Sequence, residues 1–339
     1  MFRIATSVYV KVIFVGFLFI SPSLAFAADF IIDSEPDLHR ALAQANKNNE
    51  ADTITLLSGE YRLQRRLVFS EKGTVLKGHT GVPGDVVLSG RGMRQSKGVE
   101  VLVDVQADKI TVTSVTLQNA GNHLIQVRSE KDADNFTLTN CVLRDAYEQM
   151  LKVSSLESSE HYSDNGKVEH CVFEYTKGIG PQYYIGGIDA HKSRNWLVQN
   201  NRFENIASPS QHIAEHAVHF WKDSSHTQVL NNTFINNDRG VGFGLGNRGA
   251  QHNGGLIKNN VFFHLDNHHP YADASIILER APNAVVQNNL VVQYHSYPNA
   301  IEYRFKETKG VVIEGNTVNR RIASRNGGIA SVIKNEKQR

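Results

Sequence analysis

A short phrase of alternating apolar and polar residues recurs along most of this 339-residue chain. It reads WLVQNNRFENI from Trp196, TQVLNNTFINN from Thr227 and AVVQNNLVVQY from Ala284. The residue before the turn serves as a marker and falls at Ser114, Asn140, His170, Asn200, Asn231, Asn259, Asn288 and Gly315, in steps of 26 to 31 residues. A period in this range indicates one supersecondary unit stacked on copies of itself. The sequence therefore predicts a solenoid.

Within each unit the apolar residues alternate with period two, which is typical of strands, and helical spacing is absent. Three short strands per unit predict an all-β fold, a right-handed parallel β-helix in which each strand pairs with its equivalent one coil away. The strand expected before each phrase lies at 125–128, 151–154, 188–191, 218–221, 241–244, 276–279 and 301–304.

The second asparagine of each pair is predicted to have a structural role. Asparagine tolerates the left-handed conformation that a tight bend needs, and equivalent residues in successive coils would stack into a hydrogen-bonded ladder. The residues at this position are Asn201, Asn232, Asn260, Asn289 and Asn316.

The two cysteines, Cys141 and Cys171, occupy the ladder position in successive coils. Neighbouring strands lie about 4.8 Å apart, which a disulfide can span. An oxidising compartment would favour the disulfide, and a stack of free thiols is the alternative. Two cysteines without a matching Cys or His pair do not form a zinc site.

The N-terminal segment indicates export. Residues 1–27 carry Arg3 and Lys11, an apolar run and the small-x-small sequence Ala25–Phe26–Ala27, which predicts a signal peptide cleaved after Ala27 and a periplasmic or secreted protein. Its removal takes the formal charge from +2 to 0, so the mature chain offers no argument for nucleic acid. No second apolar run would insert into a membrane, and we expect a monomer.

Residues 28–51 are predicted to form a capping segment, followed by the β-helix over 52–339. The segment 34–49 reads as a helix that begins at Ser34 and carries Leu38 and Leu42 on one face. A solenoid needs its open end covered, and this helix is expected to cover it.

The capping helix, the first coil DTITLLSGEY and the later GTVLKGHTG together resemble the pectate-lyase-like β-helix superfamily, which includes the chondroitinase B and alginate lyase group. The resemblance covers essentially the whole mature chain at the level of fold. The chain lacks the WxDH-type segment of extracellular pectate lyases, the NTD, DD, GHG and RIK motifs of polygalacturonases and the DPHD segment of mannuronan epimerases. No family active site is therefore carried over.

One class of connection is consistently long, at 175–187, 205–217, 264–274 and 293–300. Equivalent loops of successive coils gather on one side of a β-helix, and long loops on a rigid scaffold are common sites of function. These loops supply Tyr183, Tyr184, His212, Glu215, His216, His268, His269, Tyr271, Asp273, His295 and Tyr297. Such loops could equally be merely solvated.

The strands after these loops are expected to form the floor of a groove. Side chains that alternate outward include Lys152, Asp189, His191, His219, Trp221, Glu279, Glu302 and Arg304. The register of 218–221 is open by one residue, so Trp221 is either a sugar platform or part of the core. The Gly-rich segment 238–255 adds Arg239, but it lacks the strand–turn–helix context of a phosphate site.

A groove lined with cations, Tyr and His suits an acidic polysaccharide, and the matching reaction is β-elimination at a uronate. A cation neutralises the C6 carboxylate, a base removes the C5 proton and an acid protonates the leaving O4. The predicted catalytic set is Lys152, His191, His219 and Arg239, with Arg239 on the carboxylate and His191 or His219 as base. The predicted substrate-binding set is Asp189, Tyr184, His216, Trp221, Lys222 and Arg304.

No metal site or cofactor is predicted, with a Ca²⁺ ion bridging a substrate carboxylate as an open alternative. Three other functions stay open at this point. A C5-epimerase shares the proton abstraction, and a glycoside hydrolase would need Asp189 with Glu279 or Glu302. A non-catalytic carbohydrate-binding or cell-envelope structural protein would use the same scaffold, with His191 and His219 as structural histidines under the loops.

Overall fold

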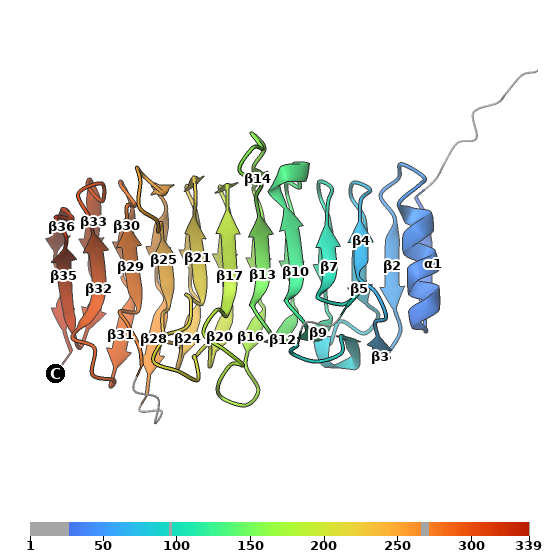
Figure 1. The fold of residues 1–339 in the computed structure, drawn as a ribbon, viewed down its shortest axis with the longest axis horizontal. Helices are drawn as coiled ribbons and strands as arrows, with labels where there is room; N and C mark the ends of the chain where they lie inside the picture. Colours follow the sequence, from blue (N-terminus) through green and yellow to red (C-terminus); the bar gives the residue numbers. More distant parts are fainter. Residues whose placement is uncertain (1–26, 95–96, 266–270, 339) are drawn as a thin grey trace, which may run out of the picture.

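The computed structural model describes residues 27–94, 97–265 and 271–338, and it confirms the predicted parallel β-helix. Figure 1 shows the coils side by side, from the N-terminal helix at one end to the last strands at the other. Each coil contributes one strand to each of three long sheets, and equivalent strands of successive coils pair in parallel.

The first long sheet has strands β1 (Asp29–Ile32), β2 (Thr53–Leu56), β5 (Val75–Gly78), β8 (Thr111–Thr113), β11 (Thr137–Thr139), β15 (Lys167–Glu169), β19 (Leu197–Gln199), β23 (Gln228–Leu230), β27 (Leu256–Lys258), β30 (Val285–Gln287), β33 (Val311–Glu314) and β36 (Ala330–Ile333). The second has β3 (Gly59–Arg62), β6 (Val86–Ser89), β9 (Thr116–Ala120), β12 (Val142–Ala146), β16 (Val172–Glu174), β20 (Arg202–Glu204), β24 (Thr233–Ile235), β28 (Val261–His264), β31 (Leu290–Gln293), β34 (Thr317–Val318) and β37 (Glu336–Lys337).

The third long sheet has strands β4 (Leu67–Phe69), β7 (Val101–Val105), β10 (His123–Arg128), β13 (Gln149–Ser154), β17 (Gly186–His191), β21 (Val218–Trp221), β25 (Val241–Phe243), β29 (Ile276–Glu279), β32 (Asn299–Arg304) and β35 (Arg321–Arg325). A fourth, short sheet joins β14 (Ser163–Asp164), β18 (Ser193–Arg194), β22 (Ser224–Ser225) and β26 (His252–Asn253). Two short 3₁₀ helices cover Pro83–Asp85 and Ser129–Lys131.

The core runs along the axis of the solenoid and explains the recurring phrase. The central residue of each short strand in the first sheet points inward and is fully buried, as at Val198 and Val229. In the second sheet the inward position holds Phe173, Phe203, Phe234 and Phe262, whose rings stack with centroids 4.5 to 5.0 Å apart. The sequence period is therefore the repeat of a stacked core.

The predicted asparagine ladder is confirmed, but the left-handed bend was assigned to the wrong residue. The first asparagine of each pair is left-handed, as at Asn231 (φ 55°) and Asn259 (φ 57°). The second is the ladder residue. Asn260 Nδ2 donates to Asn289 Oδ1 (2.9 Å) and to the Val229 carbonyl (2.8 Å). Turning the chain and satisfying the buried backbone are thus separate tasks of adjacent residues.

Replacing Asn260 by Ala is expected to lower the free energy of unfolding by about 2–4 kcal/mol, because the buried amide of Asn232 and the carbonyl of Val229 lose their partners. Urea denaturation would measure this. The control is Asn259→Gly. Asn259 lies outside the ladder, and glycine adopts its left-handed conformation readily, so stability should change by less than about 1 kcal/mol. Equal losses in both variants would contradict a ladder role.

Cys141 and Cys171 are neighbours, as predicted, and both are buried free thiols in the structure. Burial raises the pKa of the Cys171 thiol well above its ordinary value. The Cys171 backbone N–H donates to Asn201 Oδ1 (2.8 Å). The thiol stack, the second of the two alternatives, therefore continues the asparagine ladder.

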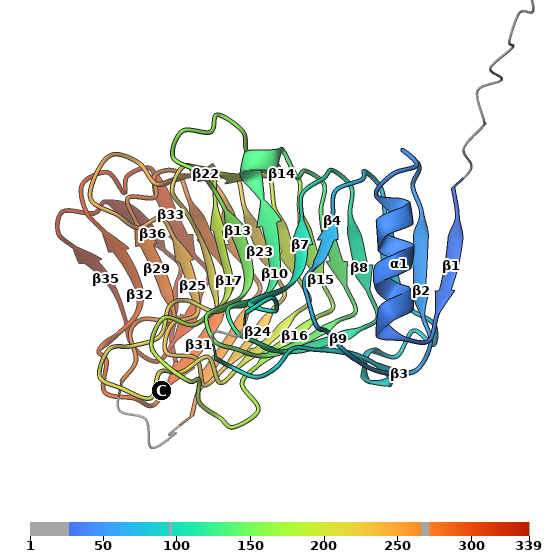
Figure 2. The same ribbon diagram turned by 45° about the vertical axis from the view of Figure 1, so that its right-hand side comes forward.

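The helix α1 (Glu35–Ala45) covers the N-terminal end of the solenoid beside β2, as Figures 1 and 2 show. Leu38 and Leu42 are buried against the core. The helix ends at Ala45, four residues before the predicted end. Ser34 precedes the helix, but its hydroxyl bonds the Asp37 carboxylate instead of a backbone N–H.

The predicted signal peptide lies, up to residue 26, outside the described residues. In the part of the chain that the structure describes, no helix is long and apolar enough to cross a membrane. The long connections run from the second sheet to the third, for example from β16 to β17 and from β20 to β21. They therefore border the third sheet, where the candidate site lies.

Candidate functional site

The third sheet places the predicted residues on its outward face in defined rows. Lys152 of β13 pairs with Asp189 of β17, and Asp189 pairs with His219 of β21. His191 pairs with Trp221 in the next outward row. The intervening Ala190 and Phe220 are fully buried in the core. This resolves the open register of 218–221, and Trp221 lies outside the core.

Asp189 is the centre of this group. Its carboxylate accepts hydrogen bonds from Lys152 Nζ and from Trp221 Nε1 (2.7 Å). Lys152 Nζ also lies 3.2 Å from His191 Nε2, and because an ammonium can only donate, Nε2 is the acceptor. His219 Nδ1 lies 3.7 Å from Asp189 Oδ1. We call these five residues, Lys152, Asp189, His191, His219 and Trp221, the Asp189 cluster.

Burial and nearby charges shift the pKa values of Asp189, His191 and Tyr184 away from their ordinary values. Burial alone would raise the pKa of Asp189, but Lys152 and the two histidines outweigh it and hold the pKa well below its ordinary range. Burial, assisted by Lys152 and Lys222, lowers the pKa of His191 to about 3. Burial and nearby carboxylates raise the pKa of Tyr184 to about 12. At neutral pH the imidazole is thus unprotonated and the phenol keeps its proton.

A second group lies where the loop 205–217 enters β21. The rings of His216 and His219 are 4.5 Å apart, and Glu215 lies beside them. Among the described residues neither ring nitrogen of His216 has a hydrogen-bond partner, although the residue is only 3% exposed. An unsatisfied buried polar group costs about 1–3 kcal/mol. Burial and neighbouring positive charges hold the pKa of His216 well below its ordinary value.

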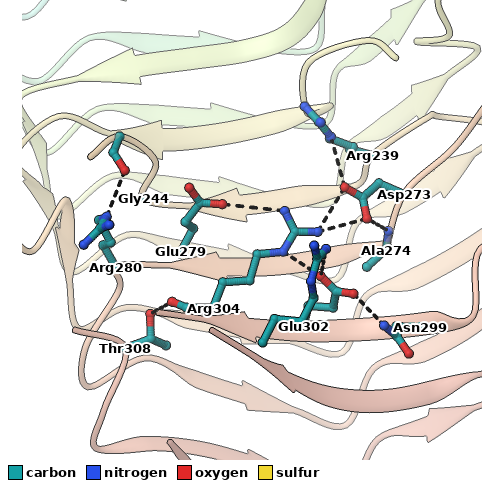
Figure 3. A network of polar contacts seen from close by, with 12 residues as sticks. Arg239, Gly244, Asp273, Ala274, Glu279, Arg280, Asn299, Glu302, Arg304 and Thr308 are labelled. Atoms are coloured by element: carbon teal, nitrogen blue, oxygen red, sulfur yellow. Dashed lines mark hydrogen bonds and ion pairs between the residues drawn. The ribbon is translucent and has the colours of Figure 1, made fainter. Parts of the chain in front are cut away.

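Farther along the third sheet, Arg304 is fully engaged in a carboxylate network (Figure 3). Its Nη2 donates to both oxygens of Asp273 at 3.0 Å, and its Nε donates to Glu302. Arg239 is held less tightly. Among the described residues its ion-pair partners Glu215 and Asp273 lie 3.6 and 3.7 Å away, and its Nε has no hydrogen-bond partner. Of the two arginines, Arg239 is the one held less firmly by the described residues.

The remaining predicted residues fall into four situations. Lys222 follows β21 and stands close enough to His191 for its charge to lower the pKa of that histidine. Tyr183 stacks on His212 at the loop rim, with ring centroids 3.9 Å apart. His295 packs on His264. The predicted His268 and His269 lie outside the described residues.

Sequence reasoning placed Glu302 among the outward side chains but missed some of the residues that hold it in place. Glu302 is fully buried and accepts hydrogen bonds from Tyr297, Asn299 and Arg325 as well as Arg304. Arg325 lies on β35, after the last copy of the recurring phrase, so the period offered no alignment for it. Gln149, which was also missed, begins β13 near the Tyr184 hydroxyl and could have been found from its place in the strand row.

Comparison with solved structures finds the same fold in proteins of very different sequence. An alginate lyase from Paenibacillus sp. str. FPU-7 superposes with a TM-score of 0.57 at 13% identity, covering 91% of this chain and 99% of that one. PfbA, a surface adhesin of Streptococcus pneumoniae, gives 0.58 at 11% identity and covers 88% and 86%. ORF18 of Geobacillus virus E2 gives 0.51 at 11% identity and covers 87% and 59%. These likenesses show the fold alone.

No curated protein sequence matches the chain significantly. The family model described as "Right handed beta helix region" matches residues 98–291, which is more than half of the chain. The match spans the coils that carry the Asp189 cluster, and the parallel pairing of their strands agrees with it. The chain therefore belongs to the right-handed β-helix family.

Proposed function

We propose that the chain is an exported polysaccharide-active enzyme, a lyase that cleaves a uronic-acid-containing polymer by β-elimination on the outward face of the third sheet. The observation that carries the proposal is the Asp189 cluster, in which side chains from the coils on either side contact the carboxylate of Asp189. Coils are about 4.8 Å apart, and the partly exposed His191 and Trp221 are the members of the cluster that a sugar unit can reach.

The geometry supports a division of the three tasks of β-elimination. Arg239 is suited to bind the C6 carboxylate because a planar guanidinium matches the two oxygens of a carboxylate and the Arg239 Nε has no hydrogen-bond partner among the described residues. His191 is suited to act as the base, since it is unprotonated at neutral pH and 12% of its side chain is exposed. Tyr184 is suited to act as the acid, because it holds its proton at neutral pH and is 40% exposed. Such opposed pKa shifts are typical of acid and base pairs.

Lys152 and Asp189 are then positioning residues. Lys152 Nζ is bound to Asp189 as well as to His191, so a turn of the His191 ring frees its Nε2 lone pair without leaving the ammonium unpaired. His219 is an unsuitable base, because it is 1% exposed and its Nε2 faces the Gly244 carbonyl at 3.1 Å. Between the two predicted bases, the structure favours His191.

Non-catalytic carbohydrate binding is the second candidate, and the half-exposed aromatic residues favour it. Tyr183 and Tyr184 are 41% and 40% exposed beside the third sheet, and Trp221 is partly exposed on its face. Aromatic faces spread along a groove are what a carbohydrate-binding surface offers. The two candidates differ in whether a bound polymer is cleaved.

The test is to incubate the pure protein with alginate, pectate, hyaluronan and chondroitin and to follow absorbance at 235 nm, where the unsaturated product absorbs. We expect one of these polymers to be cleaved. Binding of a polymer with no rise in absorbance, and no inversion at C5 by NMR, would identify a binding protein instead.

Replacing Arg239 by Gln is expected to lower kcat/KM on the cleaved polymer by about 10²–10³-fold, because a positioned charge opposite the developing enolate is lost. Arg248→Gln is the matched control, since Arg248 is exposed in the same Gly-rich segment. Steady-state kinetics at 235 nm would measure both variants. Equal activity of the two would remove Arg239 from the site.

A further inference from the structure

Glu215, His216 and His219 bring three potential metal-ligand atoms together. One atom from each residue lies within 4.8 Å of the other two. Glu215 and His216 lie near the end of the loop 205–217, two and three residues before the strand β21 that carries His219, so the rigid solenoid fixes His219 directly and His216 through the short connection to it. Two imidazoles and a carboxylate are the donor set of many three-ligand zinc sites.

The burial of His216 and the lack of hydrogen-bond partners for its ring among the described residues are an independent observation that points to a ligand. The residue is 3% exposed, and neither of its ring nitrogens has a hydrogen-bond partner among the described residues. Its ring occupies the space above Gly242, where a Cβ would lie 2.6 Å from the imidazole. Gly242 is the row neighbour of His219. The sheet therefore leaves room for a polar ring that none of the described residues satisfies.

The surroundings of His219 leave one of its ring nitrogens without a proton. Nε2 lies 3.1 Å from the Gly244 carbonyl, and since a carbonyl only accepts, Nε2 carries the proton. A backbone carbonyl on the far nitrogen is the usual second partner of a metal-binding histidine. Nδ1 is then the nitrogen that can bind an ion, with the negative charge of Asp189 3.7 Å away.

We propose that Glu215, His216 and His219 bind one divalent transition-metal ion of the zinc class. Imidazole donors select Zn²⁺ and its neighbours over Ca²⁺ and Mg²⁺, which prefer oxygen ligands. The site departs from the sequence expectation of no metal and is distinct from the Ca²⁺ alternative. Three protein ligands leave a coordination position open, and the partly exposed Glu215 places it toward solvent.

Binding requires a modest adjustment. Ligand atoms around a tetrahedral Zn²⁺ are about 3.4 Å apart when each lies about 2.0–2.1 Å from the ion, so the three atoms must approach by roughly 1.4 Å at most. Rotation of the Glu215 side chain, which is 23% exposed, brings its carboxylate closer, and small turns of the two imidazole rings bring their nitrogens together. Arg239, 3.6 Å from the Glu215 carboxylate, supplies positive charge that competes with the ion.

The experiment titrates the tag-free, chelator-treated protein with ZnCl₂ by calorimetry, and with Co²⁺ while following the visible bands of a tetrahedral ion. No polysaccharide is present, so the result is independent of lyase activity. We expect one ion per chain. His216→Ala and Glu215→Gln should each weaken Zn²⁺ affinity at least about 100-fold, more than the usual loss of an outer partner. Arg239→Gln should tighten it severalfold.

The matched control is His212→Ala, which removes an exposed histidine of the same loop and should bind Zn²⁺ like the parent protein. If circular dichroism shows that the His216→Ala variant does not fold, the Zn²⁺ affinity of the Glu215→Gln variant provides the test. The proposal is overturned if the parent protein binds no stoichiometric ion, or if binding survives both ligand variants. Loss of binding in the His212 variant alone would also overturn it, by placing the ion elsewhere.

Discussion

Replacing His191 by Ala is expected to lower kcat on the cleaved polymer by about 10²–10⁴-fold, the usual contribution of a positioned general base. The free energy of unfolding should change by less than about 1 kcal/mol, because Lys152 keeps its bond to Asp189 when the imidazole is removed. Initial rates at 235 nm and urea denaturation measure the two quantities. His161→Ala is the control, since His161 is 59% exposed.

The pH profile separates catalysis from a structural role of His191. A base must be unprotonated, and burial lowers the pKa of His191 to about 3. The kcat/KM of the free enzyme should therefore show no acid limb near 6.5, the ordinary histidine value. Full activity of the His191 variant would remove it from the mechanism. A loss of stability that matches the loss of activity would assign it to the fold.

The fold could be predicted from the sequence because the same physical requirement repeats in every coil. Each unit must bury one residue per strand, turn the chain and satisfy a buried backbone amide. Each of these requirements selects a particular residue type, which therefore recurs once per coil in the sequence. The error at the asparagine pair shows the limit of that signal. Both members are asparagine in four of the pairs, so the letters alone do not say which one turns the chain.

The site was predictable only in part, because side chains on one face acquire their roles from neighbours in other coils. The period placed Lys152, His191 and His219 on equivalent strands, with the register of 218–221 open by one residue. The structure pairs Lys152 and His219 with Asp189 and puts His191 in the next outward row. The period could not show that Asp189 is enclosed by its partners, nor that His216 lies buried with no hydrogen-bond partner among the described residues. Those facts depend on the paths of loops whose lengths vary from coil to coil.

Replacing Asp189 by Ala is expected to lower the free energy of unfolding by about 3–5 kcal/mol, the usual cost of leaving one member of a buried ion pair without its partner. Lys152, which is 8% exposed, would be left without the carboxylate that it contacts, and the Trp221 Nε1–H would lose its acceptor. Urea denaturation gives the loss. The control is Asp164→Ala, which breaks the more exposed pair with Arg194 and should cost less than about 1 kcal/mol.

The double variant Lys152→Met with Asp189→Ala tests whether the loss belongs to the pair. Removing both charges removes the uncompensated ammonium, so the double variant should be more stable than the sum of the two single losses predicts, by at least about 2 kcal/mol. Strict additivity would mean that Lys152 and Asp189 do not stabilise each other. Asp189 could then not be the residue that holds Lys152 beside His191, and the positioning role proposed for this pair would fail with it, whatever activity the protein shows.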